Sequence, residues 1–335
     1  MADPGPQMIR RVIGVTLVLS LVLVIAICMG LAAGSTGFRL AEVFQSLFGG
    51  DGGLSGDIIW RLRFPRVVLA ALLGASLSLG GMVFQALLRN PLADPYILGI
   101  SGGSAIGAII GILLGLSRFP GIWLTAFAGS LGTLALLYIL AAGRSMVRGN
   151  TLLLSGVMVN AFCSAVILFL VSMAQDHRLH NIIFWLMGDL AAATGEKVIA
   201  LAATVVPCFA VIFARSHTLN LLTMGNDLAR TMGVNIRSAT SLLLIVSSLM
   251  VSATVSYCGL VGFVGLVMPH MFRLILGPDH RVLAPASILG GAAFMVVCDL
   301  LARTLPSQGE MPVGVITALI GAPVFVYLLR RSHNP

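Results

Sequence analysis

Few side chains in this sequence could carry out chemistry, and their spacing does not assemble a reactive site. The twelve acidic residues lie almost entirely in polar stretches or near the ends of apolar runs. Asp189, in the stretch WLMGDL, supplies half of the paired-aspartate pattern of an intramembrane protease, and the sequence offers no partner motif. An intramembrane enzyme would depend on Asp189 or His270, and no catalytic constellation supports that function.

Residues that could bind metals or nucleotides are equally sparse. Asp176, His177 and His180 share a polar stretch that could form a weak metal site or simply be a solvated loop. The single lysine, Lys197 in TGEKVI, is not preceded by the glycine-rich turn that a P-loop needs to hold phosphates. We therefore predict no metal site and no cofactor in this chain, and we expect any ATP chemistry to lie in another subunit.

The composition indicates a membrane protein. Of the 335 residues, 58% are hydrophobic and only 10% are charged, and the mean hydropathy is +1.02. A water-soluble domain of this size would need far more charge to cover its surface. The net charge of +8 is typical of basic cytoplasmic loops, and we expect no nucleic acid as a partner. The chain is predicted to be an all-α polytopic membrane protein with one transmembrane domain over residues 1–335.

Apolar runs and the residues that interrupt them predict about ten membrane helices, each long enough to cross a hydrocarbon core about 30 Å thick. The first run is longer than the apolar part of a signal peptide, so we expect a membrane helix there. The predicted helices cover residues 12–33, 65–88, 95–115, 121–142, 151–173, 196–214, 238–257, 259–276, 282–302 and 312–330.

The number of helices and the basic residues predict the orientation. An even number of spans places both termini on one side, and arginines are more frequent at the helix ends on that side, which predicts cytoplasmic termini. The opposite side still holds arginines at residues 61–66 and at Arg303. These outer arginines need a separate explanation.

A polar interruption, RNPLADPYILGISGG at residues 89–103, divides the second and third predicted helices. Asn90 and Pro91 are expected to end one helix, because the residue before a proline disfavours the helical conformation. Asp94 and Pro95 supply a cap and a first-turn proline for the next helix. The third helix then carries a glycine at every fourth position, at Gly103, Gly107, Gly111 and Gly115. This spacing predicts either close packing against another helix or a face that lines a pathway.

Four separated motifs, RLRFPR, QALLRNPLADPYILGISGGSAIGA, GFVGLVMPHMFRLILGPDHR and GVITALIGAPVFVYLLRR, span essentially the whole chain. In this order they resemble the FecCD family, the permease subunits of ABC importers for iron-siderophores, haem or cobalamin. The resemblance implies a bacterial inner-membrane permease that forms a homodimer or a close heterodimer. It also implies two ATP-binding cassette subunits, which would bind ATP and magnesium, and a periplasmic or lipid-anchored binding protein.

The resemblance also assigns roles to particular residues. It implies that the outer arginines Arg63, Arg66 and Arg303 dock acidic residues of the binding protein, a contact that would set orientation and association rate. The alternative is that these arginines anchor helix ends, with Arg303 paired to Asp299 one turn earlier.

A cytoplasmic segment at residues 219–237 resembles the short helices that contact the ATPase in this family. The residues expected to couple the two subunits are Asn226, Asp227, Arg230, Met232 and Gly233. Asn226 or Asp227 could cap such a helix. An ordinary cytoplasmic loop is the alternative.

The resemblance implies a translocation path at the dimer interface, along the fifth helix and the residues that follow it. Its polar members are Asn160, Ser164 and Ser172. Asn160 could line the path or form a hydrogen bond between helices.

The resemblance implies alternating access driven by the partner ATPase, with siderophore, haem and cobalamin as alternative cargoes. An ion-coupled secondary transporter is the competing hypothesis. This hypothesis is disfavoured, because ion-coupled transporters usually keep carboxylates in mid-membrane, whereas the acidic residues of this chain lie almost entirely in polar stretches or near the ends of apolar runs.

Overall fold

The structure is a computed structural model, and it describes residues 6–32, 53–142, 149–306 and 309–332. Within these ranges the chain is helical and contains no strand. Eight helices are long and apolar enough to cross a membrane. Six of them lie within α1 (Pro6–Ala32), α7 (Gly149–Ser172), α9 (Gly195–Ala214), α12 (Ile236–Cys258), α14 (His280–Thr304) and α15 (Val313–Ser332). The other two contain α4 (Phe64–Leu88) and most of α6 (Trp123–Ala142), and they begin earlier, at Gly56 and Arg118.

Two shorter apolar helices, α5 (Ile100–Leu113) and α13 (Val264–Leu276), complete the set. The prediction of an all-helical membrane protein with about ten apolar helices is therefore confirmed. The remaining elements are short: α3 (Gly53–Ile58), η1 (Ile59–Arg63), η2 (Pro95–Leu98), η3 (Arg118–Ile122), α8 (Asp176–Leu186), α10 (Ser216–Met224) and α11 (Asn226–Thr231).

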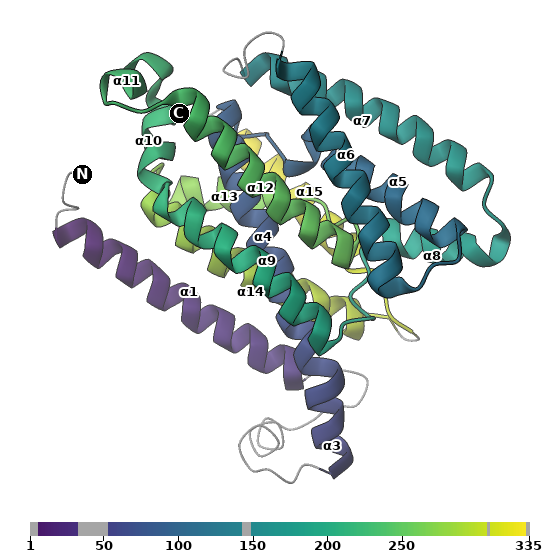
Figure 1. Cartoon of the computed structure of the whole chain (residues 1–335). Helices are drawn as coiled ribbons and strands as arrows, with labels where there is room; N and C mark the ends of the chain where they lie inside the picture. Colours follow the sequence, from purple (N-terminus) through teal and green to yellow (C-terminus); the bar gives the residue numbers. More distant parts are fainter. Residues whose placement is uncertain (1–5, 33–52, 143–148, 307–308, 333–335) are drawn as a thin grey trace.

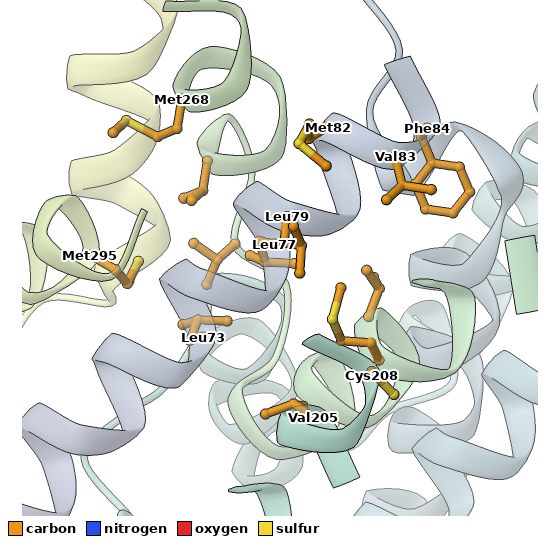
Figure 2. Close-up of a cluster of buried hydrophobic side chains, with 14 of the residues drawn as sticks. Leu73, Leu77, Leu79, Met82, Val83, Phe84, Val205, Cys208, Met268 and Met295 are labelled. Atoms are coloured by element: carbon orange, nitrogen blue, oxygen red, sulfur yellow. The ribbon is translucent and has the colours of Figure 1, made fainter. Parts of the chain in front are cut away.

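The helix α4 lies at the centre of the bundle, with α9, α12, α13 and α14 around it (Figure 1). In its most apolar window 83% of the residues are buried, against 6% for α1 at the periphery. A helix that is apolar on all sides is stable where other helices cover all of them. Figure 2 shows this packing through side chains of α4, α9, α13 and α14, among them Leu73, Leu77, Leu79, Met82, Val83, Phe84, Val205, Cys208, Met268 and Met295.

Glycines allow the central helices to approach one another closely. A Cβ atom on Gly74 of α4 would clash with the carbonyl oxygen of Gly291 in α14, and one on Gly81 would clash with that of Gly265 in α13. The predicted glycine face of α5 packs in the same way. A Cβ atom on Gly103, Gly107 or Gly111 would clash with α6 residues, so these three glycines serve helix packing. Gly115, the fourth predicted position, lies after the end of α5 with a φ of 70°, and a Cβ atom there would meet nothing within 4 Å.

Some helix boundaries differ from the sequence prediction. The expected helix over 95–115 is divided, because Gly99 adopts a positive φ of 78° between η2 and α5. The expected helix over 259–276 begins only at Val264, since Gly259 and Phe263 have φ values of 75° and 68°. Periodicity alone did not predict α8 or α3, which are too short and polar to read as membrane spans.

The two ends of the bundle carry different short elements. At one end lie α10 and α11, with the start of α1 and the last turn of α15 near them (Figure 1). We name this the α11 end. The opposite end holds α8, the start of α4 and the end of α14 (Figure 1), and we name it the α8 end.

Candidate functional site

The predicted coupling residues form a short exposed helix at the α11 end. Gly225 and Gly233, with φ values of 131° and 81°, bracket α11. Four of the five predicted coupling residues are exposed, namely Asp227, Arg230, Met232 and Gly233. Two exposed apolar neighbours, Met224 and Leu228, extend the surface that they form.

The predicted cap of this helix is wrong. The N-cap position belongs to Gly225, and no side chain caps the first turn. Asn226 instead lies inside the helix, and its side-chain oxygen accepts a hydrogen bond from the Arg89 guanidinium. The Asn226 side chain therefore connects α11 to Arg89 at the end of α4.

Arg89 forms a hydrogen-bonded connection between the coupling segment and the core, into which Leu219 and Leu222 of α10 also pack. It is the C-cap of α4, in the left-handed conformation with φ 48°. Its Nε donates to the carbonyl oxygen of Leu222 in α10 at 3.0 Å, while the other end of the guanidinium reaches Asn226 in α11. The central helix α4 is thus joined directly to both short helices. Sequence reasoning missed this role, although Arg89 lies within the polar interruption that it singled out.

Asn220 forms the second connection, between α10 and the start of α14. Its Nδ2 donates to Asp279 Oδ1 at 2.8 Å, and its Oδ1 accepts from the His280 backbone N–H at 2.8 Å. Asp279 caps α14 and pairs with Arg281 at 2.8 Å. Partial burial would raise the pKa of Asp279, but hydrogen bonds from Arg281 and Asn220 outweigh it and lower the pKa to about 2.

The turn between α4 and α5 is built as the sequence predicted. The Asp94 carboxylate accepts from the Tyr96 backbone N–H at 2.8 Å, and Pro95 occupies the first position of η2. Tyr96 in turn donates its hydroxyl to the Val261 carbonyl oxygen and accepts from the Val261 N–H, each at 3.0 Å. Burial raises the pKa of Asp94 to about 6 despite the hydrogen bond from Tyr96.

At the α8 end, the three outer arginines lie in contacts within the chain. Arg63 is 6% exposed, and its guanidinium donates to the carbonyl oxygens of Leu31 and Ala32 at 2.7 and 3.0 Å. Arg303 donates to the Gly30 carbonyl oxygen at 3.1 Å. Two arginines thus bind the last carbonyl groups of α1, where a positive charge is favourable.

Arg66 and Arg303 share one buried carboxylate. Arg66 Nε lies 2.9 Å from Asp299 Oδ1, and Arg303 Nε lies 3.1 Å from Asp299 Oδ2. Arg66 also reaches Glu310 at 2.6 Å. The predicted Arg303–Asp299 pair is therefore present, and the arginines anchor helix ends. The separate prediction that they dock a binding protein stays a prediction.

The predicted path residues lie on an exposed side of α7. Asn160, Ser164 and Ser172 are all exposed, and the two serine hydroxyls donate to carbonyl oxygens of their own helix at 2.9 and 2.7 Å. Large apolar side chains surround them on the exposed side of α7, namely Leu154, Val157, Met158, Phe162, Leu168 and Phe169.

The candidates for chemistry do not come together. Asp189 follows α8, where its carboxylate accepts from the Ala191 N–H at 2.8 Å and faces Arg118 at 3.4 Å. His270 is buried inside α13. Among the residues that the structure describes, no group of three His, Cys, Asp or Glu side chains could hold a metal ion.

Comparisons with known proteins identify the family. Residues 22–331 match the FecCD transport family. The chain is 44% identical over 273 residues to the cobalamin import system permease protein BtuC of Halobacterium salinarum, which covers 82% of this chain and 73% of that protein. It is 35% identical over 326 residues to the hemin transport system permease protein HmuU of Yersinia pestis, covering 95% and 96%.

A solved structure supports the same assignment. It is described as an inward-facing conformation of a metal-chelate type ABC transporter, and it superposes with a TM-score of 0.87 at 32% identity over 95% of this chain and 99% of that one. The resemblance inferred from the four motifs is confirmed. The relatives are transport permeases rather than enzymes, and this chain belongs to the FecCD transport family.

Proposed function

We propose that this chain is the transmembrane permease subunit of an ATP-driven importer for a metal chelate of the siderophore, haem or cobalamin class. The observation that carries the proposal is the match to the FecCD transport family over residues 22–331. The names of the relatives, a cobalamin and a hemin permease, and the description of the solved neighbour as a metal-chelate transporter support the cargo class.

The α11 end would face the cytoplasm and contact an ATP-binding cassette subunit. Support comes from α11, which exposes Met232 and Leu228 beside Arg230, a mixture typical of a protein contact surface. Arg89 and Asn220 connect this surface to α4 and α14. Movement of the ATPase would thus reach the centre of the bundle through two short connections. ATP and magnesium would be bound by the partner, and this chain would need no cofactor.

A second permease copy would cover α7. Asn160 and Ser164 lie exposed among large apolar side chains. Polar groups are costly against lipid and usually face a water-filled cavity or another helix. A homodimer with the path along α7 would provide both surroundings and would allow alternating access. The membrane would be the inner membrane of a bacterium, with both termini in the cytoplasm.

The α8 end would then receive the binding protein. Arg63, Arg66 and Arg303 are proposed to act here, and their burial requires that they act by fixing helix ends and Glu310 rather than as free charges. Glu310 has a side chain that is 46% exposed and is held by Arg66. A positioned group of this kind fixes orientation more than it adds affinity.

The proposal is tested by co-purification from a membrane in which the chain is expressed with a candidate ATP-binding cassette subunit. We expect a stable complex whose ATPase activity rises when a loaded binding protein is added. Failure to recover any ATPase with the chain, together with uptake that depends on an ion gradient, would instead establish a secondary transporter.

A further inference from the structure

A cavity of about 290 Å³ lies at the α8 end, inside one copy of the chain. It is a half-open cleft lined by the end of α5, η3, α8, the start of α9 and the end of α12. Small-molecule sites in proteins begin at about 300 Å³. The cavity therefore has room for a small polar group and a few waters, but not for a whole metal chelate. We name it the α8 cavity.

Positive charge predominates in the α8 cavity. Of the described residues that line it, Arg118, Arg178 and Lys197 are basic and Asp189 alone is acidic. The side chain of Arg118 is 60% exposed, and its contact with Asp189 is long, at 3.4 Å. The lining thus has two more permanent positive charges than negative ones.

The other two basic side chains are oriented by neutral groups. Lys197 Nζ donates to the Ala192 carbonyl oxygen at 2.6 Å. Arg178 donates to the Leu113 carbonyl oxygen at the end of α5 and, through Nε, to His177 at 3.3 Å. Carbonyl and imidazole groups fix these side chains in place without cancelling their charge. The cations are thus held in position before any anion arrives, which lowers the entropic cost of binding.

The walls of the cavity favour a planar or hydrogen-bonding anion. Trp185 of α8 and Tyr257 of α12 line it, and Tyr257 stacks on Phe119 of η3 with ring centroids 5.9 Å apart. The carboxamide of Asn181 adds donors and an acceptor. Carboxylate and phosphate groups suit this combination, since guanidinium groups bind both through paired hydrogen bonds.

We propose that the α8 cavity binds a carboxylate or phosphate group carried by the transported chelate. The inference rests on the proposed function for the identity of the cargo, and it adds a binding site within each permease copy. The cavity lies at the end of α7 where α8 begins, since α8 follows α7 directly in the chain and forms one wall of the cavity. A chelate could therefore keep its metal-bearing part on the path while its anionic group occupies the cavity.

The direct test is calorimetric titration of the purified chain in nanodiscs of phosphatidylcholine, without ATPase or binding protein. The probes are citrate and ferric citrate, with ferrioxamine B as a chelate that lacks an anionic group. We expect saturable binding of citrate and ferric citrate that weakens as salt is raised, and no binding of ferrioxamine B. Absence of saturable citrate binding to the unaltered chain would overturn the proposal.

A second test compares variants that remove positive charge from the cavity with one that removes negative charge. Arg118→Gln combined with Lys197→Gln should weaken citrate binding at least tenfold, whereas Asp189→Asn should tighten it severalfold, because the cavity loses its one acidic group. The matched control is Arg61→Gln, an exposed arginine at the same end that pairs with Asp57 and does not line the cavity; it should change nothing. Equal losses in all variants would show non-specific attraction and would contradict the proposal.

A lipid headgroup is the competing source of the same chemistry. In nanodiscs that contain phosphatidylglycerol, we expect citrate binding to persist with little change. If anionic lipid abolishes it, and the Arg118/Lys197 variant no longer responds to the lipid, the occupant is lipid and the proposal is wrong. Because these titrations need no ATPase, they remain decisive whether or not the importer function is established.

Discussion

At the scale of single residues, the clearest structural feature is the shared carboxylate of Asp299. It is fully buried and lies between Arg66 and Arg303 at 2.9 and 3.1 Å. Removing one partner of a buried ion pair leaves an uncompensated charge, which costs more than the pair itself contributes. The arginines also bind the end of α1 and Glu310, so one carboxylate supports several helix ends.

Asp299→Asn should therefore destabilise the chain by about 3 kcal/mol or more, measured by thermal unfolding in detergent. The matched control is Asp57→Asn, which removes the partner of Arg61 from an ion pair with side chains 64% and 79% exposed. Exposed pairs contribute roughly 0–1 kcal/mol, so the control should unfold near the wild-type temperature. Equal effects of the two substitutions would contradict the account of this network.

Asp94 predicts a dependence of stability on pH. Its pKa is raised from 3.8 to about 6 by burial, so the folded chain binds a proton more tightly than the unfolded chain. The stability from this group is fully present below about pH 4 and is lost as the pH rises through 6.

Asp94→Asn keeps an oxygen that can cap η2 and removes the titration. Between pH 4.5 and 7.5 the wild type should therefore lose stability relative to Asp94→Asn by roughly 1–3 kcal/mol, measured as the difference in unfolding temperature at each pH. A constant difference across this range would show that folding does not raise the pKa of the Asp94 carboxyl group.

At the scale of elements, Arg89 and Asn220 connect the exposed α10–α11 segment to α4 and α14. Both connections are side-chain hydrogen bonds to a short helix, so they can be removed without disturbing the apolar core. They are the structural basis for proposing that ATPase movement reaches the bundle.

Arg89→Ala and Asn220→Ala should each leave the chain folded and reduce the stimulation of the partner ATPase by loaded binding protein severalfold. Arg10→Ala, an exposed arginine at the same end, serves as the control and should have no such effect. Full stimulation in both variants would exclude these two residues from coupling.

The contact between α4 and α14 depends on glycine. Gly74→Ala should destabilise the chain by about 1–3 kcal/mol, because the added methyl group meets the Gly291 carbonyl oxygen and the helices must move apart. Gly14→Ala in α1 meets nothing within 4 Å and should be neutral or slightly stabilising. Unfolding temperatures of the two variants compare them directly, and similar values would contradict the close packing.

The sequence predicted those elements whose causes are local. Long apolar runs, the Asn90–Pro91 stop and the Asp94 cap each act over a few residues, so hydropathy and turn chemistry were sufficient. The break at Gly99 and the late start of α13 were missed, because apolar composition continues through residues that adopt positive φ.

The functional contacts were harder to predict because their partners are distant in the chain. Arg66 and Asp299 are separated by 233 positions, and Asn220 and Asp279 by 59, so no local pattern links them. For the same reason the sequence suggested that the outer arginines are free to bind a partner, whereas the fold buries Arg63 and Arg66. The α8 cavity was also missed, since its three basic residues come from three separate elements, η3, α8 and α9.

At the scale of the whole molecule, the two ends of the bundle differ in a way that suits a permease. The α11 end presents an exposed helix with short connections to the core. The α8 end holds buried arginines and a positively charged cavity. Between them, α7 leaves Asn160, Ser164 and Ser172 exposed among apolar side chains, and this is the surface that the proposed second copy would cover.

The central claim is that this chain supplies the path for a chelate and that a partner supplies the energy. The most direct measurement is uptake of haem, cyanocobalamin and a ferric siderophore into proteoliposomes that contain the chain and its ATPase, with loaded binding protein outside. We predict accumulation of one chelate that requires internal ATP and is lost when either the chain or the ATPase is omitted. Uptake that proceeds without ATP and follows an imposed proton or sodium gradient would contradict the account.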